Sequence, residues 1–281
     1  MNKLLYVTFL LLCTACARQY QSVTISSKQV QLQADGNFVF ENDTVRIQYD
    51  FHSLNGEMKF SVYNKLASPI YVNWKESAFI LGPHFSSYWL DQYVANGYMY
   101  SKFSGRDDFA NLRGPYHFSV VKRAEQYSFI PPHTSLVQFE FIVKPSSAYG
   151  PRYLNTSHLD NDQPKKKAKK YSFTQEESPT VFRNYLTFSM DEKGSQKFVL
   201  DQFFWVSSVV QADGISMFGP GFENTSGIKT ILNRPPSKKS DVTGYNRFLL
   251  KIPLDGVIKP DAQQTIPRQS TNPIDVARKR N

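Results

Sequence analysis

The sequence contains very little cysteine. Its only two cysteines, Cys13 and Cys16, lie close to the start of a chain of 281 residues. The rest of the chain therefore has no thiol for a disulfide, for a zinc–thiolate site or for a nucleophilic cysteine. Its folded part must depend on a hydrophobic core, and 22 phenylalanines and 16 tyrosines supply enough apolar area for one.

The sequence also lacks a long hydrophobic run. The apolar stretch from Leu4 to Leu12 is interrupted by Thr8 and is far shorter than the roughly 20 residues that a transmembrane helix needs. Lys3 precedes this stretch, and small residues follow it. This order of charge, apolar core and small residues is typical of a secretory signal peptide, which is removed from the mature protein.

The end of this leader carries a recognisable motif. The segment Leu12-Cys13-Thr14-Ala15-Cys16 resembles the lipobox of bacterial lipoproteins, although Cys13 stands where leucine is usual. The resemblance implies cleavage before Cys16 and acylation of that residue, whereas an ordinary secretory leader is the alternative. Each buried methylene of an acyl chain adds about 0.8 kcal/mol of membrane affinity, so three chains would hold the protein permanently.

The leader also predicts where in the cell the protein is located. Residues 1–15 are expected to be the signal peptide, and residues 16–33 a polar tether and spacer. The alternative for Gln19 to Gln33 is a first edge strand. Ala17 and Arg18 follow the lipidated cysteine in place of the aspartate that retains lipoproteins in the inner membrane. We therefore expect a cell-envelope protein anchored in the outer membrane, facing the periplasm in preference to the cell surface.

Acidic residues are fewer than basic ones, and the formal net charge is +9. Much of the excess lies in the run Lys165, Lys166, Lys167, Lys169 and Lys170 and in the terminal Arg278-Lys279-Arg280. Such clusters are usually solvated segments. The alternative for the lysine run is contact with a polyanion, such as the phosphates of lipopolysaccharide or anionic lipid. Nucleic acid is not expected as a partner in the envelope.

No segment shows sustained helical periodicity. Instead, apolar and polar residues alternate from Val45 to Phe51 and again from Met58 to Val62. The turn signal Asn55-Gly56 lies between the two stretches. Residues 44–63 are therefore predicted to form a β-hairpin with one face in a core and the other in water.

The same alternation continues along the chain. Ile70, Val72 and Trp74 are predicted to share the buried face of a strand, with Asn73 on its outer face. The period of two returns at 137–143, 185–188, 198–210 and 248–252. Many short strands separated by turn residues predict an all-β fold, an antiparallel β-sandwich or two in tandem, with long loops.

The composition changes along the chain and suggests boundaries. The predicted parts are a β-sandwich domain at 34–144, a flexible basic excursion at 145–179, further strands at 180–258 and a disordered tail at 259–281. The strands at 180–258 are either a second sandwich or a continuation of the first.

The first part of the chain is similar to a known group. Asn64-Lys65, the run Pro69-Ile70-Tyr71-Val72-Asn73-Trp74-Lys75 and Ser77, together with the leader and spacer, resemble β-rich lipoproteins of the Bacteroidota. The resemblance covers residues 1–80 and contains no catalytic motif. It implies an envelope location and no particular activity.

Local catalytic and metal motifs are missing. Ser119 and Lys122 have the Ser-x-x-Lys spacing of penicillin-recognising enzymes, but their neighbours predict a strand where those enzymes have a helix. The five histidines, His52, His84, His117, His133 and His158, show no metal-ligand spacing. We therefore expect no catalytic residue, no metal site and no cofactor.

An aromatic-rich region offers the best candidate for ligand contact. The side chains that could stack on sugar rings are Trp74, Tyr88, Trp89, Tyr93, Tyr98 and Tyr100. The alternative is that these rings pack in the core. Four nearby carboxylates, Glu76, Asp91, Asp107 and Asp108, could supply the pair that a glycosidase requires.

These observations leave three functional hypotheses. The leading one is a non-enzymatic, lipid-anchored envelope protein that binds another envelope component, either a protein or a glycan. The second is a hydrolase directed at glycan or cell wall that uses paired carboxylates. The third is an accessory subunit of an outer-membrane protein complex.

Overall fold

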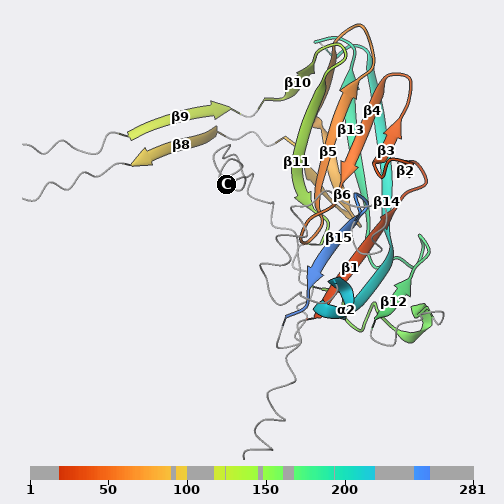
Figure 1. Cartoon of the computed structure of the whole chain (residues 1–281). Coiled ribbons are helices and arrows are strands. Elements are labelled where there is room, and N and C mark those ends of the chain that lie inside the picture. The colour runs from red at the N-terminus through yellow and green to blue at the C-terminus, as the bar shows by residue number, and fades with distance from the viewer. Residues whose placement is uncertain are drawn as a thin grey trace, which may run out of the picture.

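The computed structural model describes residues 19–89, 93–99, 117–123, 125–144, 148–160, 168–192, 194–218 and 244–253. These residues form two antiparallel sheets packed face to face and a separate two-stranded ribbon, with little helix (Figure 1). The predicted all-β, sandwich-like fold is confirmed. Among the described residues, no helix is long and apolar enough to cross a membrane.

The larger sheet has the strand order β10-β6-β13-β14-β1-β15, with β7 also paired to β6 and β12 also paired to β14. Its strands are β1 (Gln19–Ser26), β6 (Ile70–Leu81), β7 (His84–Ser87), β10 (Tyr127–Ile130), β12 (Lys169–Ser172), β13 (Val181–Ser189), β14 (Lys197–Asp213) and β15 (Arg247–Lys251). Strands from both ends of the described chain therefore share one sheet.

The smaller sheet has the order β11-β5-β4-β3-β2. Its strands are β2 (Gln31–Leu32), β3 (Phe38–Glu41), β4 (Val45–Asp50), β5 (Glu57–Asn64) and β11 (Ser135–Ile142). The two-stranded ribbon consists of β8 (Tyr93–Met99) and β9 (His117–Arg123). Two short helices, η1 (Thr156–His158) and α2 (Gly214–Phe218), complete the described elements.

The predicted hairpin at 44–63 is present as β4 and β5, which pair from Val45 opposite Asn64 to Asp50 opposite Lys59. Its alternation is seen in the burial, since Ile47 and Phe60 are buried while the neighbours of each along its own strand are partly exposed. One face of each strand therefore supplies the core, as the sequence pattern predicts.

The core lies between the two sheets and is dominated by aromatic rings. The ring centroids of Tyr49 and Phe204 are 5.0 Å apart, and those of Phe51 and Phe182 are 5.7 Å apart. In each pair one ring comes from the smaller sheet or the residue after it, and the other comes from the larger sheet. The edge-on geometry of both pairs is favourable for aromatic side chains.

A polar network is enclosed in this aromatic core. The amide of Asn184 donates to Tyr49 Oη at 2.8 Å and accepts from Tyr88 Oη at 2.7 Å. The hydroxyl of Tyr49 donates to Gln202 Oε1. Burial raises the pKa of Tyr49, so this hydroxyl keeps its proton and its role as a donor. The network links the two sheets through specific partners.

Three parts of the chain differ from the sequence predictions. The first is the predicted spacer at 16–33, because β1 begins at Gln19 and pairs with both β14 and β15. Tyr20, Val23 and Ile25 of this strand are fully buried. Gln21 and Ser22 are polar and interrupt the alternation of apolar and polar residues in the sequence, although both are buried as well.

The second difference concerns Asn73, which was predicted to face outward and is fully buried. The ladder between β6 and β13 is interrupted, since Asn73 pairs with Thr187 while Ala78 pairs with Tyr185. Ser77 holds this irregularity in place, because its hydroxyl donates to Asn73 O at 2.6 Å and accepts from Thr187 N at 3.0 Å. Simple alternation therefore fails across this bulge.

The third difference is the excursion predicted at 145–179. Its described residues include β12 and the buried side chains of Tyr149, Tyr171 and Phe173. Gln21 of β1 contacts the backbone of Tyr149 by two hydrogen bonds. This part of the excursion is therefore packed against the sandwich.

The sandwich has two distinct ends. The α2 end contains the start of β1, the end of β14 and α2, because Gln19 pairs with Asp213 and α2 follows at once. The distal end contains the start of β14, where Lys197 pairs with Ser189. The turn between β3 and β4 lies at the distal end as well, and Figure 1 shows it opposite α2.

Candidate functional site

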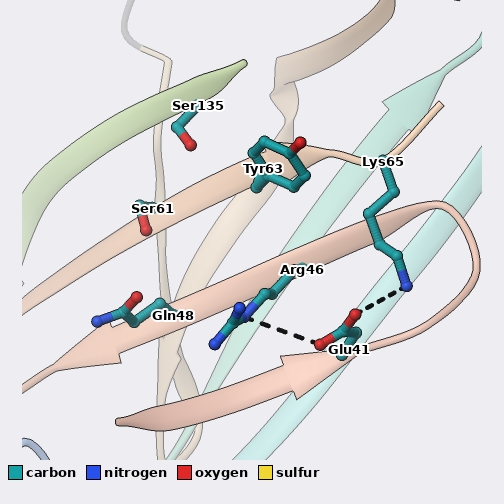
Figure 2. Close-up of a pocket in the computed structure, with 7 residues that line it drawn as sticks. All are labelled: Glu41, Arg46, Gln48, Ser61, Tyr63, Lys65 and Ser135. Carbon is teal, nitrogen blue, oxygen red and sulfur yellow. Dashed lines mark ion pairs between the residues drawn. The ribbon is translucent and has the colours of Figure 1, made fainter. Parts of the chain in front are cut away.

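The smaller sheet carries a polar hollow on its outer face, near the distal end. The hollow has a volume of about 300 Å³ and is lined by Glu41, Arg46, Gln48, Ser61, Tyr63, Lys65 and Ser135 (Figure 2). All seven side chains are on the faces of the strands that point away from the core, or directly follow such a strand.

Strand register explains why these residues meet. Arg46 of β4 lies opposite Glu41 of β3 on one side and opposite Tyr63 of β5 on the other. Tyr63 in turn lies opposite Ser135 of β11. Directly opposite residues of antiparallel strands point to the same face, so one row crosses four strands.

A second row lies beside the first. Gln48 of β4 and Ser61 of β5 are opposite each other, two positions further along each strand. The floor of the hollow therefore combines an amide, hydroxyl groups and a phenol ring on a backbone that is held by sheet hydrogen bonds. Such a floor is more rigid than a site built on loops.

The charges of the hollow are unequally partnered. Lys65 Nζ lies 2.8 Å from Glu41 Oε1 and also donates to the carbonyl of Asn42 at 2.7 Å. The hydrogen bond from Lys65 lowers the pKa of Glu41, so this carboxyl is ionised at neutral pH. Lys65 and Glu41 therefore neutralise each other to a large extent.

Arg46 is the remaining charge. Its Nε lies 3.8 Å from Glu41 Oε2, which is too long for a hydrogen bond. This buried Nε has no hydrogen-bond partner within the described part of the chain, although the side chain as a whole is 40% exposed. The guanidinium group of Arg46 is therefore only loosely paired with Glu41, and its partly exposed side chain lines the hollow.

The arrangement is suited to a sugar. Sugars carry hydroxyl groups around the ring, which amide, hydroxyl and guanidinium groups can bind, and C–H faces that pack on an aromatic ring. Gln48, Ser61 and Ser135 carry polar groups of the kind needed for the first contact, and Tyr63 carries a ring of the kind needed for the second. Arg46 adds a cation that can form paired hydrogen bonds with a carboxylate.

The aromatic platform predicted from the sequence is not formed by its first two members. Trp74 and Tyr88 are 6% and 4% exposed, and their ring centroids are 5.4 Å apart inside the core. The indole N–H of Trp74 donates to Ser128 Oγ at 2.7 Å. These two rings are therefore packing residues, because buried rings cannot stack on a ligand.

The other members of that platform have different positions. Trp89 is partly exposed, and Lys75 Nζ lies 5.6 Å from the centre of its ring. Tyr93 and Tyr98 lie on β8, and their side chains, like the whole of Tyr100, are outside the described structure. Among the described residues, partly exposed rings also come from β14, where the centroids of Phe203 and Trp205 are 6.4 Å apart.

The predicted polyanion-contact lysines are only partly described. Lys169 is exposed on β12, and Lys170 Nζ lies 3.1 Å from Asp160 Oδ2. Lys165, Lys166 and Lys167 lie outside the described residues, as does the predicted lipidation site Cys16.

Of the four carboxylates considered for a hydrolase, Glu76 alone lies in the described structure. Glu76 is exposed, and its two carboxylate oxygens lie 2.7 and 2.9 Å from Lys197 Nζ. Asp91, Asp107 and Asp108 lie outside the described residues. Within the hollow, Glu41 is the one carboxylate, and its lowered pKa is opposite to what a glycosidase general acid needs.

The remaining sequence motifs give no site in the described residues. Ser119 and Lys122 lie on strand β9, not on a helix. His52 is buried, and His84 and His133 are exposed. No group of three or more potential metal ligands occurs in the part of the chain that the structure describes.

Sequence reasoning missed the hollow although its residues were visible in the pattern. Arg46, Gln48, Ser61 and Tyr63 are the outward residues of the predicted hairpin. Outward polar residues on a strand are normally just solvated, so the alternation alone gave no reason to single them out. The signal that could have found them is the cross-strand row of Arg46 and Tyr63, which requires the register.

Comparisons with family models, with curated proteins and with solved structures found no match to this chain.

Proposed function

We propose that this chain is a lipid-anchored protein of the bacterial envelope that binds a glycan in the hollow of its smaller sheet. The observation that carries the proposal is the cross-strand row of Glu41, Arg46, Tyr63 and Ser135, which sets polar groups and an aromatic ring on one rigid face. A binding role is favoured over hydrolysis because the one carboxylate of the hollow is ionised and paired with Lys65.

The partly exposed guanidinium group of Arg46 refines the ligand class. A guanidinium group forms two parallel hydrogen bonds with a carboxylate, and these are stronger than bonds between neutral groups. The preferred glycan is therefore one with carboxylate-bearing sugars. Neutral sugars would use Gln48, Ser61 and Tyr63 and leave Arg46 without this partner.

Anchoring depends on Cys16, the cysteine of the lipobox-like segment. Replacement of Cys16 by alanine should release the protein from washed membranes, because acyl chains would supply nearly all of the membrane affinity. Cell fractionation with immunodetection measures this. Retention of the Cys16→Ala protein would contradict acylation and would favour a protein partner or an uncleaved leader as the anchor.

Binding is tested with the mature full-length protein on an array of acidic and neutral oligosaccharides, followed by calorimetry on any glycan that is retained. Tyr63→Ala and Arg46→Gln should each weaken binding at least about tenfold, which corresponds to roughly 1.4 kcal/mol. The matched control is Tyr185→Ala, since Tyr185 is also a partly exposed tyrosine but lies on the larger sheet.

The controls separate the hypotheses. Equal losses of affinity in Tyr63→Ala and Tyr185→Ala would place binding elsewhere and contradict the hollow. Absence of any glycan binding, combined with crosslinking of the protein to one envelope protein in membranes, would support the accessory-subunit alternative.

A further inference from the structure

The start of β1 is close to the proposed lipid anchor. Gln19 is only three positions after Cys16, and a chain of three residues spans at most about 10 Å, whatever its conformation. Gln19 is itself held in the sandwich, since it pairs with Asp213 and its carbonyl accepts from Ile252 N at 3.0 Å. An acylated Cys16 therefore brings the α2 end of the sandwich to the bilayer surface.

The α2 end has its own small apolar cluster. Tyr20, Ala212, Met217 and Leu249 form a buried group that is separate from the main core. Phe218 covers this group, with its ring 5.5 Å from that of Tyr20. The helix α2 is therefore fixed on a packed base.

One large apolar side chain of α2 is not covered. Ile215 is 62% exposed, while Gly214 and Met217 of the same helix are buried. Asp213 accepts hydrogen bonds from the backbone N–H of Ser216 at 2.9 Å and from its hydroxyl at 2.6 Å, which fixes the start of the helix. The exposed isoleucine is thus presented by an ordered turn.

Basic side chains lie on the strands around this end. Lys169 of β12 is opposite Gln211 of β14, and Lys251 of β15 is opposite Tyr20 of β1. Both lysines are within a few residues of the strand ends that meet α2. Lysines at this height above a membrane are attracted to the phosphates of anionic lipids.

We infer that the α2 end is a membrane-contact surface, with Ile215 entering the headgroup region and Lys169 and Lys251 contacting lipid phosphates. The inference rests on the proposed acylation of Cys16. The α2 end would contact the same lipid bilayer that holds the anchor, because a linker of three residues is too short to hold this end away from that bilayer.

This contact would orient the hollow. β14 runs from Lys197 at the distal end to Asp213 at the α2 end, and its 17 residues span about 53 Å at a rise of about 3.3 Å per residue. The hollow lies near the distal end, beside the turn that joins β3 and β4. Membrane contact at the α2 end would therefore direct the glycan-binding face away from the lipid.

The experiment uses the acylated full-length protein reconstituted in vesicles that contain anionic lipid. Since the mature chain has no cysteine besides Cys16, the variant Ile215→Cys can be labelled at a single thiol with an environment-sensitive fluorophore. Lipids that carry a spin label on the headgroup should quench this fluorophore strongly, at least twofold more than in detergent micelles without spin label.

The matched control is Val199→Cys, labelled in the same way. Val199 is also an exposed aliphatic residue of the larger sheet, at 45% exposure, but it lies near the distal end of β14, about 45 Å along the strand from α2. We expect no quenching there. Equal and weak quenching at both positions in protein that floats with the vesicles would overturn the contact surface while leaving the anchor intact.

Two further outcomes are distinguishable. Failure of the protein to float with vesicles would overturn the acylation and the contact surface together. Shielding of the fluorophore at position 215 in native membranes, without quenching by spin-labelled lipid, would assign the surface to a protein partner and would also overturn the inference.

Discussion

The side-chain amide of Gln21 pairs with the backbone of Tyr149 in the way that one strand pairs with another. Gln21 Nε2 donates to Tyr149 O at 2.9 Å, and Tyr149 N donates to Gln21 Oε1 at 2.8 Å. Gln21 is fully buried and 128 residues away from Tyr149 in the chain. This side chain therefore ties the segment 148–160 to β1, which lies between β14 and β15 in the larger sheet.

This pairing predicts that Gln21→Ala is strongly destabilising. The change removes two buried hydrogen bonds and is expected to lower the free energy of unfolding by about 2–4 kcal/mol. Chemical denaturation followed by tryptophan fluorescence measures it. Gln31→Ala, at an exposed position of β2, is the control and should change stability by less than about 0.5 kcal/mol. Similar small effects at both positions would mean that the Gln21 contact contributes little.

The aromatic core predicts a second pair of effects. Phe60 and Trp74 are 2% and 6% exposed, and truncation of either to alanine should cost about 3–5 kcal/mol. Lys59→Ala, on the outer face of the same strand as Phe60, should cost less than about 0.5 kcal/mol. Asn73 cannot serve as a surface control, because it is buried. Thermal unfolding midpoints would contradict the strand register if Lys59→Ala and Phe60→Ala shifted them equally.

The sequence predicted those parts of the fold in which one strand face is apolar and the other polar. The hairpin of β4 and β5 is such a case, because Ile47 and Phe60 are separated from their apolar neighbours by single polar residues. The preferred interpretation of β1 as a spacer, with an edge strand as the alternative, missed a strand that is paired on both sides, where Gln21 and Ser22 are buried and Gln21 is hydrogen-bonded to a distant partner. A buried polar residue with a long-range partner cannot be distinguished from a solvated one by periodicity.

The candidate site was less predictable than the fold for a related reason. Arg46 and Tyr63 are 17 positions apart and come together only through the register of β4 and β5. Ser135 joins them from β11, on a strand that is remote in sequence. Sequence pattern predicts which face each side chain occupies, but the neighbours across strands depend on pairing. The aromatic residues that drew attention in the sequence, Trp74 and Tyr88, are in the core because large rings are the best core formers.

Two glycines offer a test of close packing at a turn. Gly56 has a φ of 68°, and a Cβ added there would lie 2.9 Å from Cδ1 of Phe248, whereas Gly82 has a φ of 55° and open space around it. Gly82→Ala should therefore cost about 1–2 kcal/mol from backbone strain alone. Gly56→Ala should cost about 1–3 kcal/mol more, because the ring of buried Phe248 must move. Equal destabilisation of the two variants in urea titrations would show that the turn relaxes freely away from β15.

Titration of Asp50 should contribute to the pH dependence of the free energy of unfolding. Burial raises the pKa of this carboxyl, and the hydrogen bond that His52 N donates to Oδ1 at 2.8 Å only partly offsets the effect. The folded state thus binds the proton more tightly than the unfolded state does. The resulting stability is present below the unfolded pKa of about 3.9 and is lost as the pH rises through the higher folded pKa.

Asp50→Asn removes this titration and keeps an oxygen that can accept from His52 N. The variant should therefore gain stability relative to the wild-type protein between pH 3.5 and pH 7, because only the wild type then carries a poorly solvated charge. Urea unfolding at the two pH values measures the difference. The opposite result would be a variant whose free energy of unfolding falls relative to that of the wild type as the pH rises. It would show that Lys59, which is paired with Asp50 across β4 and β5, stabilises the carboxylate more than burial disfavours it.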